Sequence, residues 1–87
     1  MQDSLREKLE AVKETLGIVF PGVAVTMRKE GKSWKFKIDG KALRFAEDFL
    51  TTYDVDHILS MCHLAIAELR SRPADTTIHI GAPAQLS

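Results

Sequence analysis

Residues 23–38 read VAVTMRKEGKSWKFKI and decide the fold, because apolar and polar side chains alternate on both sides of a central glycine. An alternation with a period of two is typical of a strand that buries one face. The apolar members of this alternation are Val23, Val25, Met27, Trp34, Phe36 and Ile38. The pattern predicts a β-hairpin with one apolar face.

The register of this hairpin follows from its turn. A two-residue turn at Glu30-Gly31 places Lys29 opposite Lys32. The apolar pairs are then Val23 with Ile38, Val25 with Phe36, and Met27 with Trp34. A shift of one residue would set these side chains opposite lysines, so the apolar pattern itself favours this pairing.

A helix is predicted before the hairpin, from Ser4 to residue 16. Ser4 and Glu7 have the spacing of a capping box, and Gly17 is expected to end the helix. Pro21-Gly22 suits the central positions of a type II turn that leads into the first strand. The apolar residues with helical spacing are Leu5, Leu9, Val12 and Leu16.

Two further helices and a strand are predicted after the hairpin. Asp39 is expected to cap a short helix from about Lys41 to Leu50, where apolar residues recur at helical spacing. Asp54 is expected to cap a longer helix over residues 55–70. Residues 76–80 alternate in a β-rich manner and predict a third strand.

The predicted elements assemble into one α+β domain over residues 1–80, a two-layer sandwich. The order is helix, strand, strand, helix, helix, strand, with a small antiparallel or mixed three-stranded sheet covered on one face by the helices. The length of 87 residues leaves no room for a second domain. Residues 81–87 are small and aperiodic, so we expect a flexible C-terminal tail.

A cytoplasmic location is expected from three features of the sequence. The single cysteine, Cys62, cannot form an internal disulfide, as small exported domains often do. Charged residues interrupt the first twenty positions, unlike the apolar core of a signal peptide. No apolar run approaches the roughly 18 residues that span a bilayer, so no membrane partner is expected.

Charge is unevenly distributed although the formal net charge is zero. Residues 28–44 hold seven basic and two acidic side chains, a net charge of +5. The flanking segments carry −1 before and −4 after this stretch. The seven candidate phosphate contacts are Arg28, Lys29, Lys32, Lys35, Lys37, Lys41 and Arg44. Such a segment suits a polyanion, or alternatively a solvated sheet face.

The predicted order of elements resembles that of type II KH domains. Those domains bind single-stranded nucleic acid through a Gly-X-X-Gly loop between paired helices. The corresponding residues 51–56 read TTYDVD, without glycine and with two acids. The resemblance is therefore one of order alone and lacks the element that clamps the nucleic acid.

The sequence predicts no catalytic residue, no metal site and no cofactor, so the protein is not expected to be an enzyme. His57 and His63 are six residues apart, which turns them about 120° from each other on a helix. Cys62 is expected to point to the apolar side of that helix as a small buried side chain. The five glycines are scattered at turns and form no phosphate-binding loop.

Two functions remain open from the sequence. The first is a small protein-interaction module, able to form a homodimer, that acts through the uncovered sheet face. Its candidate interaction residues are Thr26, Arg28, Lys35, Lys37, Thr77 and His79. The alternative is weak binding of RNA or single-stranded DNA by the basic hairpin segment 28–44.

Overall fold

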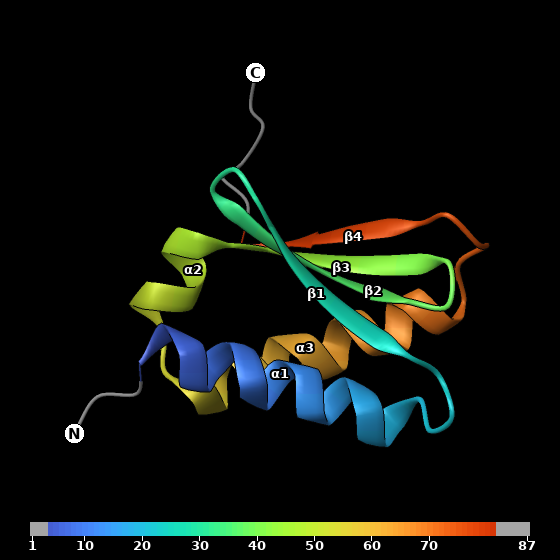
Figure 1. The fold of residues 1–87 in the computed structure, drawn as a ribbon, viewed down its shortest axis with the longest axis horizontal. Coiled ribbons are helices and arrows are strands. Elements are labelled where there is room, and N and C mark those ends of the chain that lie inside the picture. The colour runs from blue at the N-terminus through green and yellow to red at the C-terminus, as the bar shows by residue number, and fades with distance from the viewer. Residues whose placement is uncertain (1–3, 82–87) are drawn as a thin grey trace.

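The protein is an α+β domain with two layers, and its computed structural model describes residues 4–81. In Figure 1, α1 and α3 lie side by side beneath the sheet, and α2 lies at the end of the sheet where β3 stops. The elements are α1 (Leu5–Val19), β1 (Val25–Glu30), β2 (Ser33–Ile38), β3 (Lys41–Ala46), α2 (Glu47–Thr52), α3 (Val55–Arg70) and β4 (Thr77–Ile80). The predicted class is confirmed, whereas the predicted flexible tail lies, apart from Gly81, outside the described residues.

The sheet has four strands in the order β1-β2-β3-β4 instead of the predicted three. The first three strands pair antiparallel, and β4 pairs parallel to β3 after the chain returns through α2 and α3. Parallel neighbours need such a long crossover connection, and two helices supply it here. The predicted last strand therefore forms one edge of the sheet and β1 forms the other.

The predicted helix from Lys41 to Leu50 is wrong, because its first half is β3 and only its second half is helical, in α2. Asp39 and Gly40 both have positive φ, 48° and 84°. Two successive positive φ values are what a type I′ hairpin turn requires, so the chain reverses and pairs with β2. Asp39 is thus a turn residue instead of a helix cap, and the added strand also removes the agreement with the type II KH order.

The β1–β2 hairpin forms as predicted, but its register is wrong by two residues. Glu30 lies opposite Ser33, and the turn is Gly31-Lys32, with Gly31 at φ 62°. A type II′ turn needs positive φ at its first central position, and glycine supplies it without strain. Because side chains alternate with a period of two, this shift preserves the face on which every residue lies.

The first helix begins as predicted and ends three residues later than predicted. The Ser4–Glu7 capping box is present, with a 3.1 Å bond from the Glu7 N–H to the Ser4 hydroxyl. The helix continues through Gly17, and Gly22 is the glycine with positive φ, 82°. The Val23 N–H donates to the Phe20 carbonyl at 3.2 Å, which closes the predicted type II turn.

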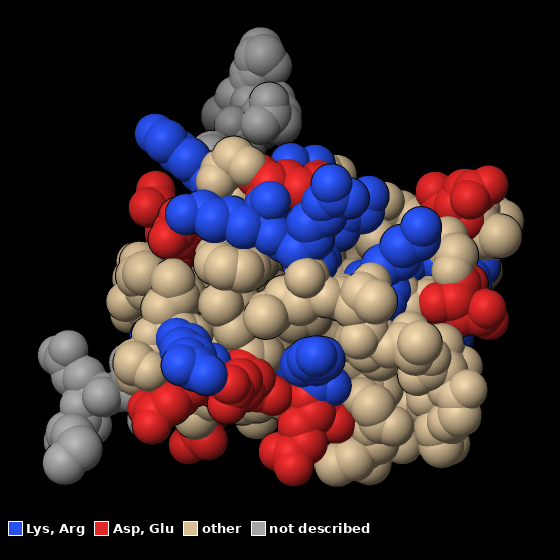
Figure 2. Space-filling model, in the orientation of Figure 1, with Lys and Arg blue, Asp and Glu red and all other residues tan. Residues whose placement is uncertain are grey.

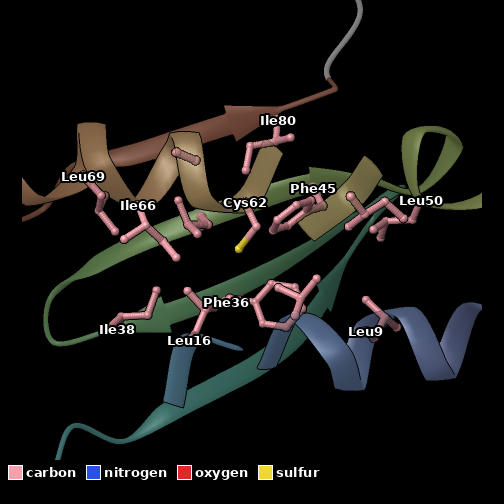
Figure 3. Close-up of a cluster of buried hydrophobic side chains, with 14 of the residues drawn as sticks. Leu9, Leu16, Phe36, Ile38, Phe45, Leu50, Cys62, Ile66, Leu69 and Ile80 are labelled. Atoms are coloured by element: carbon pink, nitrogen blue, oxygen red, sulfur yellow. The ribbon is translucent and has the colours of Figure 1, made fainter. Parts of the chain in front are cut away.

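A single apolar core fills the space between the sheet and the helices (Figure 3). Phe36 and Phe45 from neighbouring strands meet edge to face, with ring centroids 5.5 Å apart. Helices contribute side chains such as Leu16 and Cys62, which are fully buried. Burial of an apolar side chain of this size contributes about 1.5–3 kcal/mol, so this cluster is the main source of stability.

Three cationic side chains each contact a carbonyl at the C-terminal end of a helix that belongs to a different part of the fold. Lys8 Nζ donates to the Leu50 carbonyl in α2 at 2.8 Å, and Lys41 Nζ donates to the Leu69 carbonyl in α3 at 3.0 Å. An Arg70 guanidinium nitrogen lies 3.4 Å from the Val19 carbonyl of α1. Carbonyls in the last turn of a helix lack helical hydrogen-bond partners and carry partial negative charge. Each cation therefore stabilises the helix end that it contacts and links that helix to the element that carries the cation.

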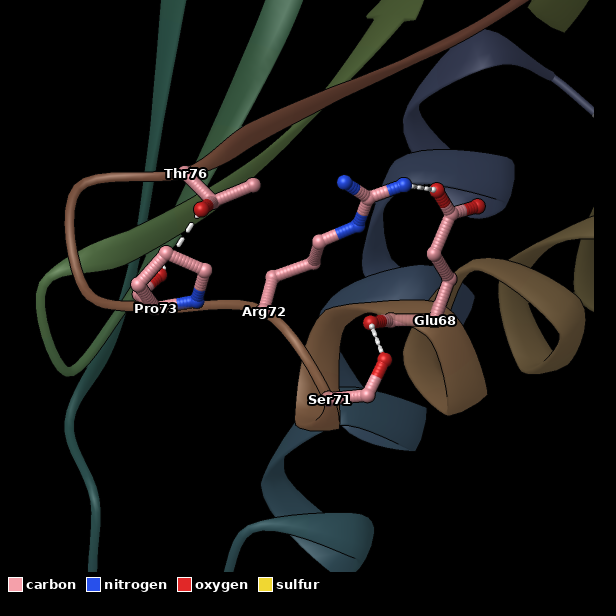
Figure 4. Close-up of polar contacts among 5 residues, drawn as sticks. All are labelled: Glu68, Ser71, Arg72, Pro73 and Thr76. Carbon is pink, nitrogen blue, oxygen red and sulfur yellow. Dashed lines mark hydrogen bonds and ion pairs between the residues drawn. The ribbon is translucent and has the colours of Figure 1, made fainter.

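The connection from α3 to β4 is held by local hydrogen bonds (Figure 4). Arg72 binds the Glu68 carboxylate at 2.8 Å, and Thr76 Oγ1 donates to the Pro73 carbonyl at 2.7 Å. The Asp75 N–H then donates to the Gly40 carbonyl at 2.9 Å. This last bond brings the turn before β4 against the turn before β3, which aligns the two parallel strands.

Replacement of Lys8 by methionine should destabilise the domain. Lys8 is only 7% exposed, so Lys8→Met keeps the buried stem but leaves the Leu50 carbonyl without its partner. We expect a loss of about 1–2 kcal/mol in the free energy of unfolding, measured by urea denaturation. Arg6→Met, at a side chain that is 87% exposed, is the control and should change it by less than about 0.5 kcal/mol. Equal stability of the two variants would contradict the role assigned to Lys8.

Two glycines should respond to alanine in opposite directions. A Cβ at Gly81 would overlap the Phe49 side chain at a φ of 74°, so Gly81→Ala should cost at least about 2 kcal/mol. A Cβ at Gly17 would meet no atom within 4 Å, so Gly17→Ala should stabilise the helix by about 0.5–1 kcal/mol. Thermal unfolding of both variants tests the pair, and a shift of the same sign in both would contradict the packing described for Gly81.

Candidate functional site

The sheet surface that faces away from the helices, here called the outer face, is uncovered in the described structure (Figure 1). Alternate residues of the four strands form it, and the three registers place them side by side. Its members are Thr26, Arg28, Glu30, Ser33, Lys35, Lys37, Ala42, Arg44, Ala46, Thr77 and His79. All six residues proposed from the sequence as an interaction face therefore lie together on it.

A row of basic and histidine side chains crosses the outer face from edge to edge. Arg28 lies opposite Lys35, Lys35 opposite Arg44, and Arg44 opposite His79, one residue from each strand. Neighbouring strands are about 4.8 Å apart, so the row spans about 14 Å. Figure 2 shows Lys and Arg side chains gathered over the sheet, while acidic side chains lie mostly over the helices and the turns.

The charges of this row are largely uncompensated. Arg44 pairs with Glu30 at 3.7 Å, across the intervening strand β2. No carboxylate of residues 4–81 lies within 4.0 Å of the charged groups of Arg28, Lys35 or Lys37. Like charges that lie directly opposite on neighbouring strands each cost about 0.2–1 kcal/mol. The fold thus carries a cost that a bound anionic group would relieve.

The seven basic residues of segment 28–44 do not form a single surface. Four lie on the outer face, Lys32 lies in the β1–β2 turn, and the other two belong to the helix side of the sheet. Lys29 lies 5.8 Å from the Trp34 ring centroid and 3.9 Å from Glu47, and Lys41 donates to Leu69. Lys29 and Lys41 thus have intramolecular partners and lie apart from the four cations of the outer face.

The outer face offers no aromatic platform within the described residues. The aromatic side chains of the sheet, Trp34, Phe36 and Phe45, all lie on the helix side. The floor between the charged side chains is instead made of small residues, among them Ala42 and Ala46. Among the described residues, this surface can bind anionic groups by charge, and only His79 and the guanidinium groups of Arg28 and Arg44 can stack on bases, in place of the aromatic rings of sheet-based binders of single-stranded nucleic acid.

A groove between α1 and β1 was not found from the sequence. It has a volume of about 580 Å³ and is lined by Glu10, Lys13, Glu14, Gly17, Val23 and Val25. The feature of the sequence that could have indicated this groove is Gly17, which was interpreted as a helix end but lies within α1. The groove runs beside the free edge of β1, next to the outer face.

An aromatic chain leads from the core to the surface at the α2–α3 junction and was also missed. Phe49 packs 5.0 Å from Tyr53, and Tyr53 stacks on His57 with ring centroids 4.4 Å apart. Within residues 4–81 no cluster of three or more metal-ligating side chains exists, and the His57 ring packs on Tyr53.

The Cys62 thiol lies at the centre of the core. Burial disfavours the thiolate and raises the pKa of Cys62 to about 11. The thiolate is the reactive form of cysteine, so this side chain is a buried apolar group in the folded protein.

Cys62 should therefore react with a thiol reagent only through unfolding. At pH 8 a thiol with a pKa of about 11 is ionised in about one molecule in a thousand, and the core also excludes the reagent. We expect labelling of the native protein with a chromogenic disulfide to be slow. The rate should rise in parallel with the unfolded fraction as urea is added, and fast native labelling would contradict the burial of Cys62.

Comparison with known proteins finds no matching family model and no significant match among curated proteins or solved structures. The function is accordingly inferred from the surfaces of this chain. None of the helices in the described part of the chain has the length and apolar character needed to cross a membrane.

Proposed function

We propose that this domain is a non-enzymatic interaction module that binds an acidic partner protein through its outer face. The observation that carries the proposal is the row of Arg28, Lys35 and Arg44, ending in His79, across an uncovered sheet, in which Arg28 and Lys35 have no carboxylate partner among the described residues. Arginine guanidinium groups bind carboxylates through two parallel hydrogen bonds. Two arginines separated by a lysine suit a surface with several carboxylates.

The side chains around this row favour a protein partner. The outer face has short side chains between the long cationic ones, at Ser33, Ala42 and Ala46. Hydroxyl groups lie at its borders, at Thr26 and Thr77. A partner that presents several carboxylates fits this charge, and Ala42, which is only 3% exposed, offers it little apolar surface. Among the described residues, the outer face has no Phe, Tyr or Trp ring, so bases have only His79, Arg28 and Arg44 to stack on.

Charge also decides between a different partner and a second copy of the chain. Two outer faces placed against each other would oppose four cations with four cations, with only Glu30 as a counter-charge on each side. Like-charge juxtaposition of this kind costs several kcal/mol. We therefore propose a heterotypic partner and do not extend the proposal to a face-to-face homodimer.

Weak binding of RNA or single-stranded DNA is the competing proposal, supported by the same cations. With at most four outer-face cations neutralising phosphates, the logarithm of the affinity should fall with the logarithm of salt concentration with a slope of about −3 or shallower. An oligothymidylate that binds more tightly than an acidic peptide of equal charge, at equal salt, would favour this alternative.

Charge reversal of Lys35 should abolish most of the binding to an acidic ligand. The probe is a fluorescent octaglutamate peptide, titrated at low salt and followed by anisotropy. Lys35→Glu should weaken binding at least about tenfold, because Lys35 is between Arg28 and Arg44 in the row. Glu30→Gln should strengthen binding, because it frees Arg44 from its only carboxylate partner among the described residues.

The matched control for Lys35→Glu is Arg6→Glu, which changes the net charge equally but lies on α1, in the helix layer. It places a negative charge near a helix N-terminus, where such a charge is favourable, so the fold should be retained. The proposal predicts that Arg6→Glu binds octaglutamate nearly as well as the natural protein. Equal weakening by both variants, or no binding of the peptide by the natural protein, would overturn it.

A further inference from the structure

The outward edge of β1 is a free strand edge. Among residues 4–81, β1 pairs only with β2, so alternate backbone N–H and carbonyl groups of Val25–Glu30 point away from the sheet. No other backbone segment of residues 4–81 hydrogen-bonds to these groups. β1 has six residues, whereas β4 at the opposite edge has four. The edge of β1 can therefore form more backbone hydrogen bonds with an added strand than the edge of β4 can.

The groove beside this edge contains a glycine that the isolated fold does not explain. Gly17 lies inside α1, where glycine costs about 0.5–1 kcal/mol relative to alanine. It has no positive φ, and a Cβ added to it would meet no atom within 4 Å. Neither backbone conformation nor packing within the chain therefore requires glycine at this position. Its effect is to leave open the groove wall that faces Val23 and Val25.

We propose that an extended segment of the acidic partner adds to the edge of β1 as a fifth strand and fills this groove. The inference deepens the proposed function, on which it rests, by naming the form of the ligand. Side chains of a strand point alternately to the two faces of a sheet. One set from the added strand enters the groove between β1 and α1, and the other set lies on the outer face beside Thr26 and Arg28.

The charges around β1 specify which residues the segment carries. On the outer face, Arg28 has no carboxylate partner within the described residues and favours an acidic side chain beside it. In the groove, Val23 and Val25 favour apolar side chains; Glu14 disfavours acidic ones, whereas Glu10 pairs with Arg6 at 3.3 Å and Lys13 adds a positive charge. The ligand is thus a segment in which apolar and acidic residues alternate. A shift of one residue would place its acidic side chains against Val23 and Val25 and its apolar side chains beside Arg28, so the two valines also select the register.

The probe is a capped eight-residue peptide of four Val-Glu repeats. Its matched control has the same composition in two blocks, four valines followed by four glutamates, which removes the alternation. A second control is the alternating peptide with N-methyl groups on the backbone amides that face β1, which blocks the ladder without a change of charge. We expect the alternating peptide to bind at least about tenfold more tightly than either control, and to slow hydrogen exchange of β1 amides.

The protein variant that tests the groove is Gly17→Leu. The space at Gly17 is open and leucine favours helix, so the folded protein should be at least as stable as the natural one. The leucine side chain occupies the groove, so binding of the alternating peptide should fall at least about tenfold, whereas octaglutamate binding at the outer face should be unchanged. Gly17→Ala, which adds one methyl group, should have a smaller effect than Gly17→Leu.

The outcomes separate this inference from the proposed function. If Gly17→Leu and N-methylation leave binding of the alternating peptide unchanged while Lys35→Glu weakens it, the added strand is overturned and the outer-face function stands. If the natural protein binds neither octaglutamate nor the alternating peptide, both proposals fail. If binding is lost in Gly17→Leu and β1 amides are protected only with the alternating peptide, the added strand is supported.

Discussion

The pairing of β3 with both of its neighbours is the constraint on which the rest of the structure depends. β3 joins the antiparallel part of the sheet to the parallel β4, and its Leu43 and Phe45 are fully buried against the helices. The turn at Asp39-Gly40 starts this strand, and the Gly40 carbonyl accepts the bond that aligns β4. Because β3 is a strand, Arg44 points to the outer face and completes the basic row.

Basic residues have two different roles in this fold. Lys8, Lys41 and Arg70 reach helix C-terminal carbonyls on other elements, so their charges help to hold the layers together. Arg28, Lys35 and Lys37 have no carboxylate partner among residues 4–81 and lie on the outer face. A count of charges along the chain cannot separate these roles, because they depend on which helix end lies within reach of each side chain. The proposed interaction surface consists of cations that contact no helix C-terminal carbonyl of the described residues.

The sequence predicted the elements whose signals are local. The alternation in residues 23–38 predicted the hairpin and its faces, Ser4 and Asp54 predicted the starts of two helices, and Pro21-Gly22 predicted a type II turn. The strand β3 was missed because its apolar residues continue into α2 with helical spacing. The signal that was overlooked is Asp39-Gly40, since Asp-Gly between two apolar runs is a strong hairpin signal. The hairpin register was wrong because glycine was placed at the second central position of the turn instead of the first.

The amino-acid sequence by itself determined the α+β class and the two faces of the hairpin. It also determined that four polar side chains lie on one surface, those of Thr26, Arg28, Lys35 and Lys37. The reason is that a two-residue error in register does not change the face of any residue when side chains alternate with a period of two. Only the tertiary structure decided that Arg44 joins this surface between Lys35 and His79, since its position depends on β3 being a strand that pairs with both β2 and β4. It also decided that Lys29 and Lys41 have partners within the molecule, and that Gly17 lies beside the free edge of β1. The physical reason is that local backbone preferences act over a few residues, whereas these placements result from contacts between residues far apart in the chain.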